Sequence, residues 1–300
     1  MKLIKPKFEI IEQEPGLEGI YKAIELAGRT CYKSEDKITP VSAEEFVNRM
    51  IKSGHHAMLE FGTVYLMAET KDFVGPDGHV IYVNPLEKYE NNPYSKVEMD
   101  VDDNFYITTN YRVLVEHNWL NDLKYLCEPT EYHERRVTVH FVCDRGVSHE
   151  FVRHRVMSFA QESTRYCNYS KNKFGSELTF IIPCWLDIPT GYYAYWDDDW
   201  WDIDKMKIQL PEGEHRDIDA FLWTLNVAEI HYTLLINSGW KPQEARAVLP
   251  NSLKTELVMT GFVSDWQHFF GLRCDKAAHP QARELAIPLQ EEFIKRGYIN

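Results

Sequence analysis

Arginine side chains are concentrated in one short segment, residues 153–166, which reads RHRVMSFAQESTRY. Guanidinium groups are planar donors that match the oxygens of phosphate, and short hydroxyl groups close around the same oxygens. The donors of this kind in the segment are Arg153, Arg155, Arg165, Ser158, Ser163 and Thr164. Residues 153–166 are therefore a candidate anion-binding segment.

Arginines also pair with carboxylates on solvated surfaces, and Glu150 and Glu162 are close in sequence. The segment by itself leaves both interpretations open, because short motifs match by chance.

Composition restricts the class of protein. The chain has 300 residues, 44% of them hydrophobic, and a formal net charge of -13. This predicts a globular protein of enzyme size and disfavours nonspecific nucleic-acid binding, which needs a broad basic surface. The first ten residues contain no apolar core of a signal peptide, and no run of eighteen apolar residues occurs. We therefore expect a cytoplasmic protein without a membrane span.

Neither cysteine nor histidine spacing predicts a metal site. The six cysteines form no C-x-x-C pair, which is typical of reduced thiols in a cytoplasm. His149 and His154 are five residues apart, so on a helix they are rotated by about 140° and cannot share a zinc ion. The chain also lacks a Gly-rich phosphate loop, so side chains must hold any nucleotide.

Apolar periodicity predicts helices at residues 17–28 and from Ser42, where Ser42–Glu45 has the form of a capping box, to a stop at Gly54. β-Forming residues predict strands at Phe61–Met67 and Arg136–Asp144. Ser148 is the expected N-cap of the arginine-rich segment. Further helical segments are expected near 111–126, from Ile218 to Gly239, and at 243–248, 264–273 and 281–296, the last kinked at Pro288.

Two stretches rich in Pro, Gly and Asp, about 70–104 and 185–215, are expected as insertions, the first irregular or hairpin-bearing and the second irregular. With no internal repeat or linker, residues 1–300 are predicted to form a single α+β domain. In this domain, helices pack against a small, mainly antiparallel sheet.

The spacing R-H-R, seven residues, then Ser163 resembles the signature of the flavin-dependent thymidylate synthases. Three further segments resemble motifs of that family, in the same order. These are Gly54–Glu60 (GHHAMLE), Glu244–Pro250 (EARAVLP), and the segment from Thr260-Gly261 through Trp266 and His268 to Leu272-Arg273. The resemblance extends over most of the chain outside the two insertions and implies that family's fold.

The resemblance implies roles for individual residues. Arg273 is the implied catalytic group, a permanent cation that polarises uracil. The implied dUMP contacts are Glu150, Arg153, Gln161, Glu162, Ser163, Thr164, Arg165, Arg246 and Arg273. The implied FAD contacts are His55, Ala57, Glu60, Arg153, His154, Arg155, Gln161 and His268. The chain departs from the family pattern at Glu150, Ala57, Phe262 and Ser264, where the family has glutamine, threonine, asparagine and arginine.

The implied reaction is the reductive methylation of dUMP to dTMP, with methylenetetrahydrofolate as carbon donor and NADPH-reduced FAD as hydride source. No protein nucleophile or metal is needed. The resemblance also implies a homotetramer whose sites are shared between subunits, with no nucleic-acid or membrane partner.

Two other functions remain possible on the sequence. One is a non-catalytic nucleotide-binding module, which the arginine cluster allows. The other is a classical cysteine-dependent thymidylate synthase, because Cys184 lies in a Pro-Cys-Trp segment. Trp185 stands where the classical enzymes have histidine, and no cation lies near in sequence to activate the thiol. We therefore expect Cys184 to be a buried structural residue.

Overall fold

The structure is a computed structural model, and it describes residues 1–300 except 75–78, 170–176, 197, 202–206 and 211–215. At its centre lies a four-stranded antiparallel sheet in the order β2-β8-β14-β9. The strands are β2 (Lys7–Ile11), β8 (Arg136–Asp144), β14 (Lys254–Phe262) and β9 (Ser158–Gln161). The longest pairing joins β8 to β14 over nine residues, from Lys254 opposite Asp144 to Phe262 opposite Arg136.

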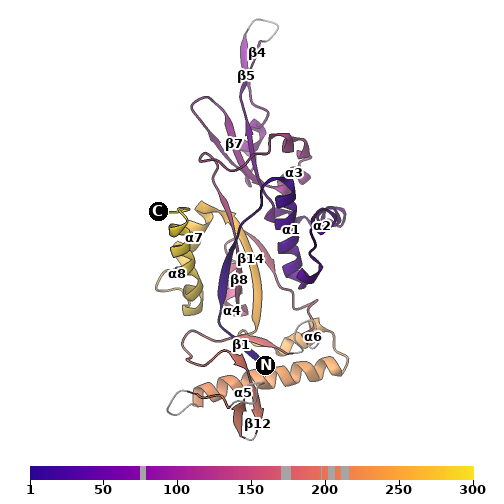
Figure 1. The fold of residues 1–300 in the computed structure, drawn as a ribbon, viewed down its shortest axis with the longest axis vertical. Helices are drawn as coiled ribbons and strands as arrows, with labels where there is room; N and C mark the ends of the chain where they lie inside the picture. The colour runs from indigo at the N-terminus through magenta and orange to yellow at the C-terminus, as the bar shows by residue number, and fades with distance from the viewer. Residues whose placement is uncertain (75–78, 170–176, 197, 202–206, 211–215) are drawn as a thin grey trace.

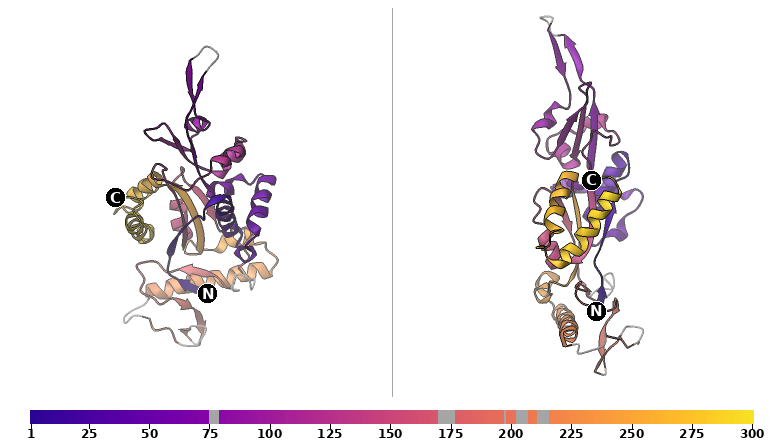
Figure 2. Two further views of the ribbon diagram at one scale, coloured as in Figure 1. Left: turned by 45° about the horizontal axis from the view of Figure 1, so that its top comes forward. Right: turned by 90° about the vertical axis from the view of Figure 1, so that its left-hand side faces the viewer.

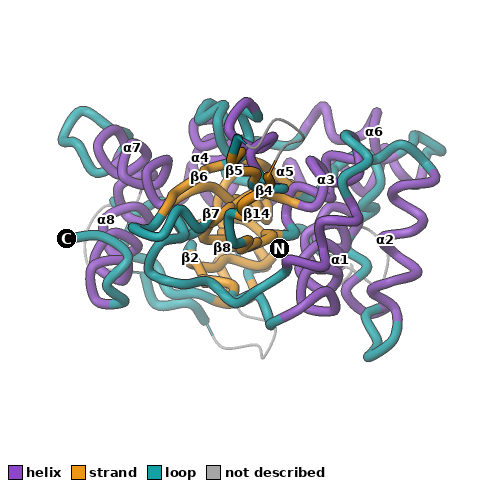
Figure 3. Tube along the Cα trace, turned by 90° about the horizontal axis from the view of Figure 1, so that it is seen from above, coloured by secondary structure: helices purple, strands orange, loops and turns teal. Residues whose placement is uncertain are grey.

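Helices cover both faces of this sheet (Figures 1 and 3). On one face lie α4 (Arg145–Phe151), α7 (Val263–Arg273) and α8 (Pro280–Lys295). Phe141, Met259 and Trp266 belong to the large apolar core on this side. On the other face lie α1 (Gly16–Tyr32) and, beyond it, α2 (Ser42–Lys52). Ala27 of α1 packs there against Val258.

A second layer of strands extends the molecule beyond α1, at the top of Figure 1. Its sheet has the order β3-β7-β6, and a separate two-stranded hairpin, β4-β5, projects from it. The elements are η2 (His56–Phe61), β3 (Thr63–Ala68), β4 (Lys71–Val74), β5 (Val80–Val83), β6 (Lys96–Met99), β7 (Phe105–Asn110), α3 (Tyr111–Glu116) and η4 (Leu120–Tyr125). The hairpin expected within 70–104 is therefore present, although its tip lies outside the described residues.

The opposite end of the molecule carries a third core around the long helix α5 (Figure 2). A small sheet in the order β10-β1-β11 and a hairpin β12-β13 lie beside the helix. The elements are β1 (Lys2–Ile4), β10 (Thr179–Ile181), β11 (Gly191–Tyr192), β12 (Ala194–Trp196), β13 (Asp199–Trp201), α5 (Arg216–Asn237), α6 (Pro242–Ala245) and η6 (Arg246–Val248). Part of the second expected insertion thus forms strands, and the rest lies outside the described residues.

The α+β class and most predicted elements are confirmed. The helix expected at 17–28 is α1, the strand at 136–144 is β8, and the closing helix is α8, which continues through Pro288. The stop at Gly54 is also confirmed, because Gly54 has φ +70°, a conformation that glycine adopts without a steric penalty. Among the described residues, no helix is both long and apolar enough to cross a membrane.

Both predicted caps are wrong. Ser42 is the first residue of α2, and its hydroxyl donates to Glu25 Oε2 at 2.8 Å and accepts from the amide of Thr39, before the helix, instead of from an amide of the first turn. Ser148 lies inside α4, whose N-cap is Asp144, and the Asp144 carboxylate accepts from the Val147 amide at 2.8 Å. The Ser42 hydroxyl bonds to a carboxylate from another helix, and Asp144, four residues before Ser148, caps α4 in place of that serine.

The periodicity of the sequence did not predict strands β2, β9 and β14. Six consecutive residues at the end of β14, from Leu257 to Phe262, are buried because helices cover both faces of the strand. Such a strand shows no alternation of polar and apolar residues, which is the signal that identified β8.

Candidate active site

Arg273, at the C-terminal end of α7, is fixed by three hydrogen bonds. Its Nη1 donates to Glu150 Oε2 at 2.9 Å, its Nη2 to the Glu150 carbonyl at 2.6 Å, and its Nε to His154 Nε2 at 3.0 Å. The side chain is 15% exposed. A guanidinium has five N–H donors, so two are left for a ligand. Burial lowers the pKa of Arg273, which Glu150 opposes, and the group stays cationic at neutral pH.

His154 is buried and uncharged. Burial, with the nearby charges of Arg273 and His268, lowers the pKa of His154 to about 4. Its ring lies 4.9 Å from the ring of Phe269 and 6.0 Å from that of His268, between centroids. Because Nε2 accepts from Arg273, the proton of the neutral ring is on Nδ1. His154 therefore orients Arg273 and is a poor proton acceptor.

The ion pairs considered for the arginine-rich segment are not formed. Glu150 pairs with Arg273, and Glu162 pairs with Lys254 at 2.8 Å. Arg153 and Arg155 are exposed, and no carboxylate of the described residues pairs with either guanidinium. An exposed, unpaired guanidinium is free to bind an anion.

The turn after β9 carries a second group of predicted residues. The Ser163 amide donates to the carbonyl of Cys31, at the end of α1, at 3.0 Å. The hydroxyl of Thr164, which is buried, accepts from Arg246 Nη1 at 3.0 Å. Arg165 is exposed, with its guanidinium 5.4 Å from the centroid of the Tyr166 ring. The structure thus brings the turn and the Arg246 motif together across 82 residues of sequence.

The residues from Gly54 to Met58 line a cavity of about 470 Å³ beside the end of α1. His55 and Ala57 are exposed there, and Cys31 and Tyr32 of α1 complete one wall. Glu60 is held by Arg112, whose Nη1 lies 2.5 Å from its carboxylate. This third group adjoins the turn after β9, because the rings of Tyr32 and Tyr166 lie 5.3 Å apart.

Gln161 lies between the first two groups. Its side-chain nitrogen donates to Ser148 Oγ at 2.8 Å and to Thr255 Oγ1 at 3.2 Å.

At the positions where the chain departs from the motif, Phe262 is buried and the amide of Ser264 donates to Glu134 at 3.0 Å. The helix α7, which ends at Arg273, lies on one side of the central strands, whereas α1 and α6, which adjoin the His55 and Arg246 groups, lie on the other (Figure 3).

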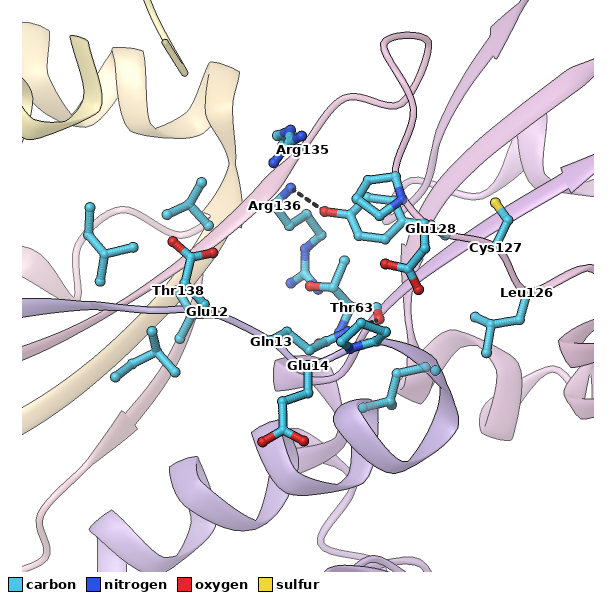
Figure 4. Close-up of a pocket in the computed structure, with 18 of the residues that line it drawn as sticks. Glu12, Gln13, Glu14, Thr63, Leu126, Cys127, Glu128, Arg135, Arg136 and Thr138 are labelled. Atoms are coloured by element: carbon cyan, nitrogen blue, oxygen red, sulfur yellow. Dashed lines mark hydrogen bonds between the residues drawn. The ribbon is translucent and has the colours of Figure 1, made fainter. Parts of the chain in front are cut away.

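The cavity in Figure 4 lies elsewhere, between the loop before α1 and the start of β8. Arg136 donates there to the carbonyl of Glu60 at 3.0 Å and to Thr63 Oγ1 at 3.3 Å. Burial lowers the pKa of Arg136 to about 10. Glu60 belongs to η2 and Thr63 to β3. Arg136 therefore holds these two elements together at the end of the His55 to Glu60 segment.

Sequence reasoning missed a charged network beneath the turn. Lys33, Lys254 and Glu256 join Glu162 there, and His140 Nε2 lies 3.0 Å from Glu256 Oε2. Lys254 and Glu256 are two residues apart on β14, so their side chains point to the same face of the sheet. This spacing could have indicated the network only if residues 254–262 had been recognised as a strand.

The expectation that Cys184 is buried is wrong, because its side chain is exposed. Partial desolvation and the charge of Glu284 nevertheless raise the pKa of the Cys184 thiol. A thiol with a raised pKa is protonated at neutral pH and is a weak nucleophile. All six cysteines lie within the described residues, and each is free.

Comparison with known proteins gives one family. The model of the family described as "Thymidylate synthase complementing protein" matches residues 128–296. A flavin-dependent thymidylate synthase of Pyrococcus furiosus is 31% identical over 157 residues, 52% of this chain and 53% of that protein. The chain thus spans about half the length of the archaeal relatives it matches.

Two other similarities cover more of the chain. A flavin-dependent thymidylate synthase of Corynebacterium aurimucosum is 23% identical over 279 residues, 92% of this chain and 76% of that protein. A crystal structure of the UMP/dUMP methylase PolB from Streptomyces cacaoi, bound with 5-Br dUMP, aligns over 98% of this chain and 93% of that one. The TM-score is 0.42, with 17% identity.

Proposed function

This chain belongs to the thymidylate synthase complementing protein family, and we propose that it is a flavin-dependent thymidylate synthase. In this reaction dUMP becomes dTMP, methylenetetrahydrofolate provides the carbon and NADPH provides the reducing equivalents. The observation that carries the proposal is that four arginines of the motif segments have no carboxylate partner among the described residues. These are Arg153, Arg155, Arg165 and Arg246, in a chain with 46 acidic and 33 basic residues.

The donors available fit a flavin dinucleotide. Arg153 and Arg155 offer exposed guanidinium groups for its phosphates, and the cavity at His55 and Ala57 has apolar and polar walls for a ring system. His268 is exposed beside His154 and can stack on a ring. When bound, the flavin supplies the hydride.

The chain's own residues position and polarise dUMP. Arg165 and Arg246, with the backbone at Ser163 and Thr164, are proposed to hold its phosphate and sugar. Arg273 uses its two remaining N–H groups on uracil, where a fixed cation stabilises negative charge as C5 becomes nucleophilic. Glu150 and His154 hold the guanidinium in place, so it does not reorganise during the reaction.

Residues 1–300 are proposed to act as one domain in a cytoplasmic homotetramer. The Arg273 group and the His55 group lie on opposite sides of one sheet, and the cavity at His55 is not lined by Arg153, Arg246 or Arg273. This separation supports a site built from residues of more than one subunit.

The test is a purified preparation incubated with its substrates. We expect a yellow protein whose flavin absorbance is bleached by NADPH under anaerobic conditions and which forms dTMP from dUMP and methylenetetrahydrofolate. The Cys184→Ala variant should keep this activity. A colourless protein that needs Cys184 would support the classical enzyme, and dUMP binding without turnover would support a binding module.

A further inference from the structure

We propose that Lys254 is a positioning residue, which holds the turn of residues 163–165 in its nucleotide-binding shape through a buried ion pair with Glu162. The inference rests on the proposed function, because it assigns a role to a group beneath that site. Lys254 does not itself contact the nucleotide in this proposal. It acts through Glu162, the residue directly before Ser163.

Both ends of Glu162 are fixed. The residue is 2% exposed, and its backbone amide donates to the carbonyl of Glu256 at 2.8 Å. One carboxylate oxygen accepts from Lys254 Nζ at 2.8 Å, and the other accepts from the Tyr169 hydroxyl at 2.9 Å. A buried carboxylate with two such donors has one stable position, so the chain leaves β9 in a defined direction.

A second tether reaches the turn from α1. Lys33, directly after α1, lies 2.5 Å from Glu256 Oε1, and Lys254 lies 2.6 Å from the same oxygen. Two residues before Lys33, the carbonyl of Cys31 accepts from the Ser163 amide at 3.0 Å. The ion pairs therefore join β14, the end of α1 and the start of the turn into one unit.

Lys33 and Lys254 face the carboxylates of Glu162 and Glu256, and Lys33 also pairs with Glu35 at 3.4 Å. Burial by itself lowers the pKa of Lys254, but Glu162 and Glu256 outweigh it and raise the pKa. Burial likewise raises the pKa of Glu256, but His140, Lys254 and Lys33 outweigh it and hold the pKa well below its usual range. Removal of the Lys254 ammonium leaves Glu162 charged and buried with only a tyrosine donor, so the carboxylate moves toward water and the turn follows.

The experiment compares dUMP binding in the flavin-loaded protein and its variants by calorimetry. In Lys254→Met we expect the dUMP dissociation constant to rise by about tenfold or more, because small displacements of positioning groups have large effects. Flavin content and the KM for NADPH should stay unchanged, which a general loss of structure would not allow. Lys254→Arg should restore most of the affinity. Lys22→Met, which removes an exposed ammonium paired with Glu14 and Glu18, is the matched control and should bind dUMP normally.

Tyr169→Phe provides an independent measurement if Lys254→Met does not fold. It removes one donor to the same carboxylate, and we expect a rise of about threefold in the dUMP dissociation constant. Unchanged dUMP affinity in the folded variants overturns the role of Lys254. A wild-type protein that binds flavin but no dUMP instead overturns the proposed function, so the two failures are distinguishable.

Discussion

Arg273 and the two residues that hold it give the most direct test at the scale of single side chains. In Arg273→Ala we expect the fold and bound flavin to be retained and kcat to fall by at least ~100-fold, as for other electrostatic stabilisers. Arg273→Lys should also fail, because one ammonium cannot replace three N–H bonds in a fixed plane. Arg296→Ala, at an exposed ion pair with Glu292, is the control. Near-normal turnover in Arg273→Ala would remove this residue from the mechanism.

His154 predicts how stability depends on pH. Its pKa is lowered from 6.5 to about 4 in the folded chain, so the unfolded chain takes up a proton first as pH falls. The neutral ring contributes about 3 kcal/mol to the free energy of unfolding. This contribution is complete above about pH 6.5 and is lost as the pH falls toward 4. We expect urea titrations from pH 7 to 4.5 to show this decline.

The same titrations with His154→Gln should show a shallower decline over this range. His231→Gln, on an exposed part of α5, is the control and should behave as the wild type. An identical pH profile in His154→Gln would contradict the buried neutral state of this imidazole.

At the scale of elements, glycine allows α1 and α2 to approach closely. A Cβ added at Gly28 would lie 2.4 Å from the Phe46 ring, which is buried between the two helices, whereas a Cβ at Gly271 in α7 meets nothing within 4 Å. We expect Gly28→Ala to lower the free energy of unfolding by about 1–3 kcal/mol through overpacking. Gly271→Ala should raise it by about 0.5–1 kcal/mol, because alanine is the better helix former. If chemical denaturation gave the same change in the free energy of unfolding for Gly28→Ala and Gly271→Ala, the close contact between α1 and Phe46 would be contradicted.

The strands β8 and β14 show which strands can be predicted from the local sequence pattern. β8 alternates between an apolar face against α7 and a more polar face, and its predicted bounds coincide with the structure. β14 pairs with it along its full length but has buried residues on both sides, so its pattern is a continuous run. Its pairing, and the convergence of Lys254 with Glu162, depend on contacts between residues that are far apart in sequence.

At the scale of the whole molecule, the proposed tetramer would bring residues from the two sides of the central sheet into one site. We expect light scattering to give about four times the 35.3 kDa of one chain. We also expect co-expressed Arg273→Ala and His55→Ala chains to regain activity, because a mixed assembly contains some sites with both wild-type residues. Each variant assembled with itself is the control and should stay inactive. Mixed tetramers without activity would show that one chain supplies both residues.

The sequence by itself determined the chemistry that is available. It identified the arginines, the order of the four motifs, the α+β class and those helices and strands whose periodicity is local. Tertiary structure alone decided which guanidinium groups are neutralised by carboxylates. Glu150 forms an ion pair with Arg273, and Glu162 forms one with Lys254. Arg153 and Arg155 therefore have no carboxylate partner among the described residues. The reason is physical: ion pairing depends on distance and burial in the folded chain, and spacing along the sequence fixes neither across a sheet.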